Sequence, residues 1–322
     1  MQRLVILIAS AISITVFQSC LLALGGVALA SDSQFNTVAD VKYTPQEMEV
    51  LESTVTYFVL RDQDRDRRSE YEEAIREVWE ITPLEFVFFD DLDNTPSDGA
   101  TFFMLDVPAH GQDIDQPHFS GPLPYLQLSL VLPSWIDKSN GDFREGSKVF
   151  ASISLILESP ISWNYDDYNR YLESYRSLYA SEVIINWSPQ LLKTFIKAIN
   201  DDFKSKDGNS NGYRDLKVEE FRDDLALKPI YILESYFDNP YLNANRIRRE
   251  RASKLYRDNF ELVSLEELDR LMTSDEEVFF LDLGMFKRSI YYQRVLSSER
   301  GIAYSRINTS SMLKPVAMSK IR

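Results

Sequence analysis

The chain has 322 residues, of which 44% are hydrophobic and 12% aromatic, and this composition is typical of a packed globular protein and excludes a disordered one. The formal net charge of -15 disfavours nucleic acid and anionic lipid as partners, because both would be repelled, and favours solubility or cationic ligands. The length is sufficient for two domains of ordinary size.

The first thirty residues have the features of an export signal. Arg3 gives a short basic start, and no further charge occurs before the small-residue pattern of Ala28 and Ala30. We therefore expect a signal peptide over residues 1–30, with cleavage before Ser31. The mature protein would be exported, to the periplasm, the cell envelope or the exterior.

Two alternatives exist for this segment. Its apolar run is long enough to span a bilayer as an uncleaved anchor, although Gly25 and Gly26 would weaken such a helix near its end. Lipid attachment at Cys20 is the second alternative, but the chain stays apolar for ten residues after that cysteine. Because Cys20 is the only cysteine, a chain cleaved before Ser31 has no disulfide and depends on burying apolar area.

Residues 31–43 are polar and without periodicity, which predicts a tether before a first lobe over residues 44–203. Thr44, Pro45 and Glu47 are typical of a helix start. Apolar residues then recur with helix or strand spacing. The expected strands are 54–60, 84–89, 101–107, 125–130 and 149–157, the last two antiparallel, and the expected helices are 70–79, 165–179 and one beginning at Ser188.

Residues 204–224 are expected to form a linker and a short helix, because Lys204–Gly212 contains no apolar residue and two glycines. A second lobe follows over residues 225–322. Its expected strands are 230–233, 260–263 and 278–283, and its expected helices are a basic one over 242–256 and one capped by Ser264 and Glu267. A hairpin of 290–296 and 302–307 closes the chain, with Gly301 in its turn.

The chain also contains a faint internal repeat. Leu84–Asp93 aligns without a gap on Phe260–Asp269, and the same offset holds for Phe103–Val107 over Phe279–Leu283. The repeat predicts an α+β or α/β protein of two similar lobes, each a small mixed sheet with packed helices and an antiparallel hairpin.

Three segments of the chain are similar to segments of other proteins: Trp187–Lys193, Lys228–Leu233 and the closing hairpin Tyr291–Tyr304. In these segments the chain resembles exported bacterial proteins of unassigned function with tandem α/β lobes. The resemblance covers most of the mature chain but consists of strand and turn patterns. It implies an envelope or secreted location and a default that is not catalytic.

Metal chemistry has one candidate segment. His110, Asp113, Asp115 and His118 supply two imidazoles and two carboxylates in the loop after the third strand, and these are ligand types for zinc or another divalent metal. The competing interpretation is an ordinary surface loop, because prolines and glycines surround these residues and their spacing matches no established site.

Calcium is suggested at two places and fits neither well. Asp207, Asn209 and Asn211 match the first half of a calcium-binding loop, but Val218 occupies the position of the bidentate glutamate. Asp62, Asp64 and Asp66 also alternate, yet Arg67 and Arg68 replace the residues that such a loop requires.

Asp106 and Asp282 are equivalent in the repeat and lie near the end of the third strand of each lobe. Equivalent acids at strand ends could line a cleft between lobes as an acid and base pair, or could cap the turns that follow.

Taken as a whole, the sequence predicts a non-catalytic protein that binds a protein or small-molecule ligand. The alternative is a metal-assisted hydrolase that uses the 110–118 loop.

Overall fold

The computed structural model describes residues 39–96, 98–106, 121–132, 148–163, 176–180, 183–205, 209–211, 216–239, 260–274, 276–285 and 291–308. The chain divides into two compact units, residues 1–35 and 36–322, and all described residues belong to the second. The expected signal peptide lies outside the described residues. Among those described, no helix combines the length and apolar character that crossing a membrane requires.

The first lobe contains a seven-stranded mixed sheet in the order β3-β2-β4-β5-β6-β1-β7. Strand β2 is parallel to both β3 and β4, and all other neighbours are antiparallel. The strands are β1 (Asp40–Lys42), β2 (Val55–Leu60), β3 (Leu84–Phe88), β4 (Ala100–Asp106), β5 (Gly121–Leu132), β6 (Lys148–Trp163) and β7 (Asn209–Asn211).

The second lobe contains a six-stranded sheet in the order β10-β9-β11-β12-β13-β8. Here β9 is parallel to β10 and β11, and the remaining pairs are antiparallel. The strands are β8 (Leu216–Lys217), β9 (Ile230–Leu233), β10 (Phe260–Val263), β11 (Phe279–Met285), β12 (Tyr291–Ser297) and β13 (Gly301–Asn308).

The two sheets repeat one topology. Numbered along the chain within each lobe, the strands stand in the order third, second, fourth, fifth, sixth and first, and each pair has the same relative direction in both lobes. Strand β7 extends the first sheet beyond this shared set. The prediction of two similar mixed-sheet lobes with antiparallel hairpins is therefore confirmed.

The strand register adds one detail to the repeat. A row of paired residues runs through Leu84, Thr56 and Thr101 in the first sheet, and through Phe260, Ile230 and Phe279 in the second. The gap-free alignment places Phe279 on Phe103 instead, so β11 is displaced by two residues along its sheet. A shift of two residues leaves every side chain on its original face, and the apolar pattern survives it.

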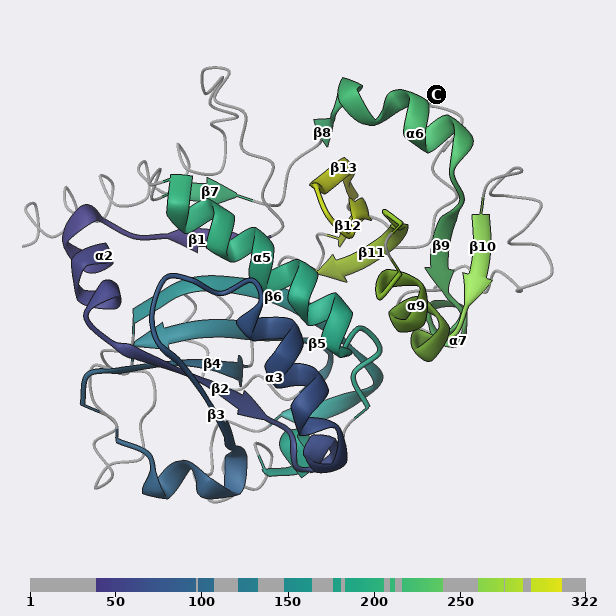
Figure 1. Cartoon of the computed structure of the whole chain (residues 1–322). Helices are drawn as coiled ribbons and strands as arrows, with labels where there is room; N and C mark the ends of the chain where they lie inside the picture. Colours follow the sequence, from purple (N-terminus) through teal and green to yellow (C-terminus); the bar gives the residue numbers. More distant parts are fainter. Residues whose placement is uncertain are drawn as a thin grey trace, which may run out of the picture. The chain divides into compact units, whose positions relative to one another are not determined.

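Helices α3 (Arg68–Arg76) and α5 (Pro189–Ser205) lie side by side over one face of the first sheet (Figure 1). Both are amphipathic, as the spacing of their apolar residues predicts, and each turns its apolar side to the sheet. The buried apolar side chains of α5 include Leu191, Leu192, Phe195, Ile196, Ile199 and Phe203. A shorter helix, α2 (Pro45–Glu52), begins with the expected capping box, because Thr44 and Glu47 exchange hydrogen bonds of 2.7 and 3.3 Å.

The second lobe has shorter helices around its sheet. They are the 3-10 turn η3 (Glu219–Phe221), α6 (Arg222–Leu227), α7 (Ser235–Asp238) and α9 (Leu265–Met272). Only half of the capping box expected for α9 forms. Ser264 accepts from the Glu267 amide at 3.2 Å, but the Glu267 carboxylate accepts from Arg270 within the helix.

The two lobes share one apolar core and touch through specific polar contacts. Buried residues of both sheets belong to a single cluster, in which Phe58 represents the first lobe and Ile232 the second. Asp269 of α9 accepts from the Gln190 amide at the start of α5 at 3.0 Å, and also binds Arg67 at 3.3 Å. Asn239 donates to the Leu157 carbonyl of β6 at 2.7 Å.

Several expected elements differ from the structure or lie beyond its described part. The stretch expected to be a linker contains β7, which pairs with β1. Of the helix expected over 165–179, residues 176–179 are described and are helical. The expected basic helix over 242–256 lies outside the described residues.

Candidate functional site

Each lobe has one position at which a parallel α/β sheet commonly binds ligands. The chain leaves β2 for β3 on one side and then crosses to β4 on the other, so the carboxyl ends of β2 and β4 form a topological switch point. The carboxyl ends of β9 and β11 form the same arrangement in the second lobe. Functional side chains are therefore expected at these two places.

The switch point of the first lobe holds a buried carboxylate. Asp64 lies in the 3-10 turn η1 (Asp62–Arg67) directly after β2, and is 5% exposed. It accepts from Arg61 at 2.8 and 3.0 Å, from the Trp187 indole at 2.9 Å and from the Tyr71 hydroxyl at 3.2 Å. The Arg61 guanidinium also lies 4.8 Å from the Trp187 ring centroid.

This network leaves Asp64 no role as a metal ligand or general base, because both of its oxygens already accept from protein donors. Burial and the nearby Asp64 charge raise the pKa of Tyr71, so its phenol stays protonated and donates. The network instead holds η1, α3 and the start of α5 together.

A tyrosine closes the neighbouring strand end. Tyr179 is fully buried, accepts from the Leu105 amide of β4 at 2.6 Å and stacks on Phe89 at a centroid distance of 4.3 Å. Its pKa is raised by burial. The second lobe repeats the device, since the buried Tyr236 hydroxyl bonds the backbone of Leu283 on β11. In both lobes the tyrosine bonds a part of the strand, β4 or β11, that extends past its parallel neighbour, β2 or β9.

The second lobe contains the most deeply buried ion pair among the described residues. Asp282 of β11 and Arg294 of β12 are direct cross-strand neighbours, with side chains 1% and 0% exposed. Arg294 donates from Nε at 3.0 Å and from Nη2 at 2.6 Å to one carboxylate oxygen. Burial raises the pKa of Asp282, against opposing effects of Arg294 and the Asn186 amide of the first lobe.

An aromatic ring supports this pair from the next cross-strand position. Tyr292 faces Gly284, and the Arg294 guanidinium lies 4.1 Å from the Tyr292 ring centroid. The ring occupies the space where a side chain at Gly284 would be, since a Cβ there would lie 1.9 Å from the Tyr292 hydroxyl oxygen. A glycine at position 284 is therefore required to make room for the Tyr292 ring. The ring in turn supports the Arg294 guanidinium.

The acids predicted to be equivalent do occupy matching strands, but their surroundings differ. Asp282 faces Arg294 and Asp106 faces Gln127, but the two-residue displacement of β11 places Asp282 level with Met104, which faces Ser129. Asp282 is buried, and Asp106 is half-buried. Their predicted partnership across a cleft stays a prediction, and Asp282 is engaged by Arg294 instead of being presented to solvent.

The other predicted site residues fall largely outside the structure's described part. His110, Asp113, Asp115 and His118 lie in the undescribed stretch between β4 and β5, as Asp207 does between α5 and β7. The backbones of Asn209 and Asn211 form β7, where they pair with Lys42 and Asp40. Within the described ranges, no three His, Cys, Asp or Glu side chains gather as metal ligands would.

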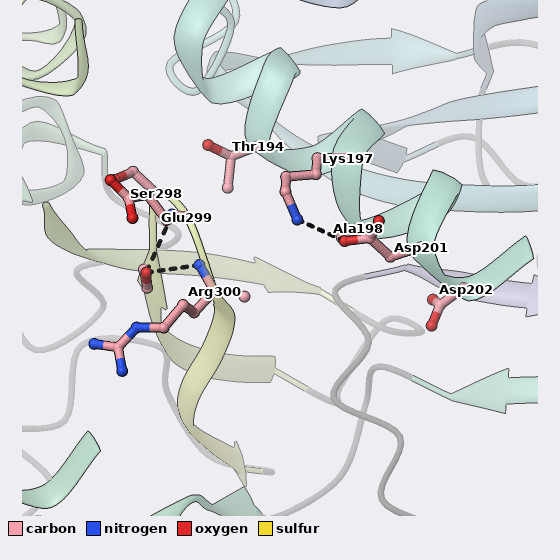
Figure 2. A pocket seen from close by; sticks show the side chains of 10 residues that line it. Thr194, Lys197, Ala198, Asp201, Asp202, Ser298, Glu299 and Arg300 are labelled. Atoms are coloured by element: carbon pink, nitrogen blue, oxygen red, sulfur yellow. Dashed lines mark hydrogen bonds and ion pairs between the residues drawn. The ribbon is translucent and has the colours of Figure 1, made fainter. Parts of the chain in front are cut away.

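A polar pocket lies where α5 of the first lobe meets the β12–β13 turn of the second (Figure 2). It is a small hollow of about 50 Å³ that is open to solvent. Its walls carry hydroxyls, carboxylates and cations. The lining residues are Thr194, Lys197, Ala198, Asp201, Asp202 and Ser297–Gly301.

Internal contacts occupy part of this wall. Lys197 is turned along α5 toward Asp201, at 2.6 Å, and Arg300 points away from the helix (Figure 2). Arg300 is held by Glu277 and Asp224 at 2.6 Å each. The turn itself is fixed because Ser297 accepts from the amides of Glu299 and Arg300.

Sequence reasoning did not identify the buried partners of these networks. A signal existed for Arg294, because this charged residue stands between Tyr292 and Leu296 at alternate positions of a predicted strand. Trp187 and Asp64 are far apart in the sequence, and no local pattern joins them.

Comparison of the chain with protein-family models, with curated proteins and with solved structures finds no match.

Proposed function

We propose that the chain is an exported binding protein, or an envelope-interaction protein, that takes a polar ligand or partner between its two lobes and has no catalytic role. The observation that carries this proposal is the pocket between α5 and the β12–β13 turn, which draws its walls from both lobes. Pockets at junctions between lobes are common ligand sites.

The chemistry of the pocket favours a ligand rich in hydroxyl or ammonium groups. Asp201, Asp202 and Glu299 contribute carboxylates, of which Asp201 is paired with Lys197, and Arg300 is paired with Glu277. The net charge of -15 also favours cationic ligands over anionic ones, because it attracts cations and repels anions.

The buried acids at the strand ends agree with a role in binding. A catalytic acid or base must reach its substrate. Asp64 and Asp282 are instead inaccessible and held by arginines, so they serve the architecture.

The test measures the thermal unfolding midpoint of the mature protein with spermidine, glucosamine and maltose as cationic and neutral probes. We expect a rise with at least one cationic probe, because a ligand that binds the folded state stabilises it. Ser298→Trp should abolish the rise by filling the pocket, while Ser274→Trp, at the exposed end of α9, should preserve it. A rise that survives Ser298→Trp would place binding elsewhere.

A metal-assisted hydrolase is the second candidate. The 110–118 loop follows β4, and its origin at the carboxyl end of that strand beside the switch point favours this alternative. Metal analysis of the purified protein separates the two proposals. Stoichiometric zinc that is lost in a His110→Ala/His118→Ala variant would support the hydrolase.

A further inference from the structure

Among the described strands, β3 forms one edge of the first sheet, and none of them pairs with its outer side. The Pro83 carbonyl accepts from Thr56 of β2, and carbonyl directions alternate along a strand. The Leu84 and Phe86 carbonyls therefore point outward, to the side where another strand could pair.

Arginine side chains of α3, the helix that precedes β3 in the chain, donate to these outward carbonyls. Arg76 donates to the Leu84 carbonyl at 2.6 Å, and Arg68 donates to the Phe86 carbonyl at 3.3 Å. The two acceptors are consecutive outward positions of the edge.

The same arginines cover the aromatic side chains of the strand. The Arg76 guanidinium lies 5.0 Å from the Phe86 ring centroid, and those of Arg65 and Arg68 lie 4.1 and 5.5 Å from the Phe88 ring centroid. Carboxylates hold the arginines in place: Asp62 binds Arg65 at 2.7 Å, Glu72 binds Arg68, and Glu85 lies 3.9 Å from Arg76.

We infer that Arg65, Arg68 and Arg76 form a cover that prevents β3 from pairing with β3 of a second copy of this chain. The segment Leu84–Phe89 contains one charged residue and no glycine or proline, and its aromatic and β-branched content favours strand pairing. An uncovered edge of this kind is a template for association, which proteins commonly block with charged side chains. The arginines are 46–48% exposed at their side chains, so they act at the surface and not within the core.

The test compares an Arg68→Ala/Arg76→Ala variant of the mature protein with wild type by sedimentation over a hundredfold concentration range. We expect the variant to associate, with an average mass at least twice that of wild type at the highest concentration. In the associated form, hydrogen exchange at the Phe86 amide should slow by tenfold or more. The matched control is Arg222→Ala/Arg270→Ala, which removes the same charge away from β3 and should sediment as wild type does.

A second control separates edge pairing from aggregation of a weakened fold. Ile199→Ala creates a cavity beneath α5 and leaves the arginines in place. At a comparable unfolding midpoint, this variant should keep the wild-type mass. The inference is overturned if the arginine variant keeps the wild-type mass at every concentration, or if Ile199→Ala associates to the same extent.

Discussion

The pair of Asp282 and Arg294 shows how a cross-strand partner determines whether a sheet can bury an acidic side chain. The gap-free alignment matches Asp282 to Asp106, which faces Gln127 and is half-buried. The second sheet can bury its acid completely, because Arg294 gives the charge a partner inside the protein. As a consequence, substitution of either residue leaves the other buried without its partner and destabilises the protein.

Removing one partner of this pair should therefore destabilise the protein strongly. We expect Asp282→Asn or Arg294→Met to lower the free energy of unfolding by about 3–5 kcal/mol, since each leaves a buried group without its partner. Asp282→Leu/Arg294→Met should be close to neutral, because an apolar pair of similar volume carries no desolvation penalty. Urea unfolding measures all three. Additive losses in the double variant would show that the pair is not coupled.

Gly284 provides a second prediction at a single residue. A methyl group there would collide with the Tyr292 ring, so Gly284→Ala should cost about 1–3 kcal/mol of unfolding free energy through overpacking. The same substitution should cost much less in a Tyr292→Leu background, where the ring is gone. Equal costs in the two backgrounds, measured by urea unfolding, would mean that the ring does not impose the glycine.

At the scale of elements, the β12–β13 hairpin is fixed by its turn. Gly301 has a φ of 88°, the left-handed conformation that its position predicted, and Ser297 caps the amides of the turn. Glu277 then secures the hairpin from the preceding segment, because it accepts from Ser297 and binds Arg300 at 2.6 Å and Lys228 at 3.4 Å.

These contacts predict a dependence of stability on pH. Burial opposes ionisation of Glu277, but hydrogen bonds from Arg300 and Ser297 prevail and lower its pKa below 4.5. The carboxylate therefore contributes stability that is present above about pH 4.5 and is lost as the pH falls through the lowered pKa. Glu277→Gln should flatten the fall in unfolding free energy below pH 4.5. An undiminished fall in the Glu277→Gln variant would refute the assignment.

Local signals in the sequence predicted the elements well, and long-range contacts were beyond them. Capping residues such as Thr44 and the alternation of apolar residues mark helix starts and strands within a few positions. The repeat also predicted that Leu105 and Leu281 would occupy the same strand position. Both are buried, but the two-residue displacement of β11 places Leu281 level with Phe103. The alignment also matches Val87 to Val263 and predicts that both are buried. Val263 is buried, whereas Val87, on the edge strand β3, is half-buried.

The candidate site could not be predicted in the same way. Its walls come from α5 and from a hairpin turn about a hundred residues later, and neither segment contains an unusual pattern of its own. The polar run from Lys204 to Gly212 was interpreted as a linker for a similar reason. The pairing of Asn209–Asn211 with β1 depends on backbone groups, which carry no sequence signature.

At the scale of the whole molecule, the described lobes are held together by a shared apolar core and a few directed polar contacts. Asp269 is the most connected of these, because its carboxylate serves both the first turn of α5 and Arg67. A carboxylate at a helix start is favourable for its charge and for the amide that it satisfies.

Loss of this contact should weaken the protein moderately. We expect Asp269→Ala to lower the unfolding free energy by about 1 kcal/mol, the usual cost of a lost helix cap. Asp269→Asn should lose less, because an amide oxygen can still accept from Gln190. Both variants should unfold in a single transition, since the core is continuous. Two separate transitions in urea would show that the lobes are independent units.

The position of β1 at the far side of its sheet has a consequence for how the protein is made. Asp40 pairs with Ser152, so the strand that is synthesised first waits for a partner roughly 110 residues later before it can be placed. Its other neighbour, Asn211, is synthesised later still. The growing chain thus cannot complete its first sheet from local hairpins, and folding dominated by such distant pairings is slow. We expect the docking of β1 to limit the rate of refolding. A chain that lacks residues 1–38 but keeps β1 should refold at the wild-type rate. A chain that also lacks β1 should refold faster, to a less stable state.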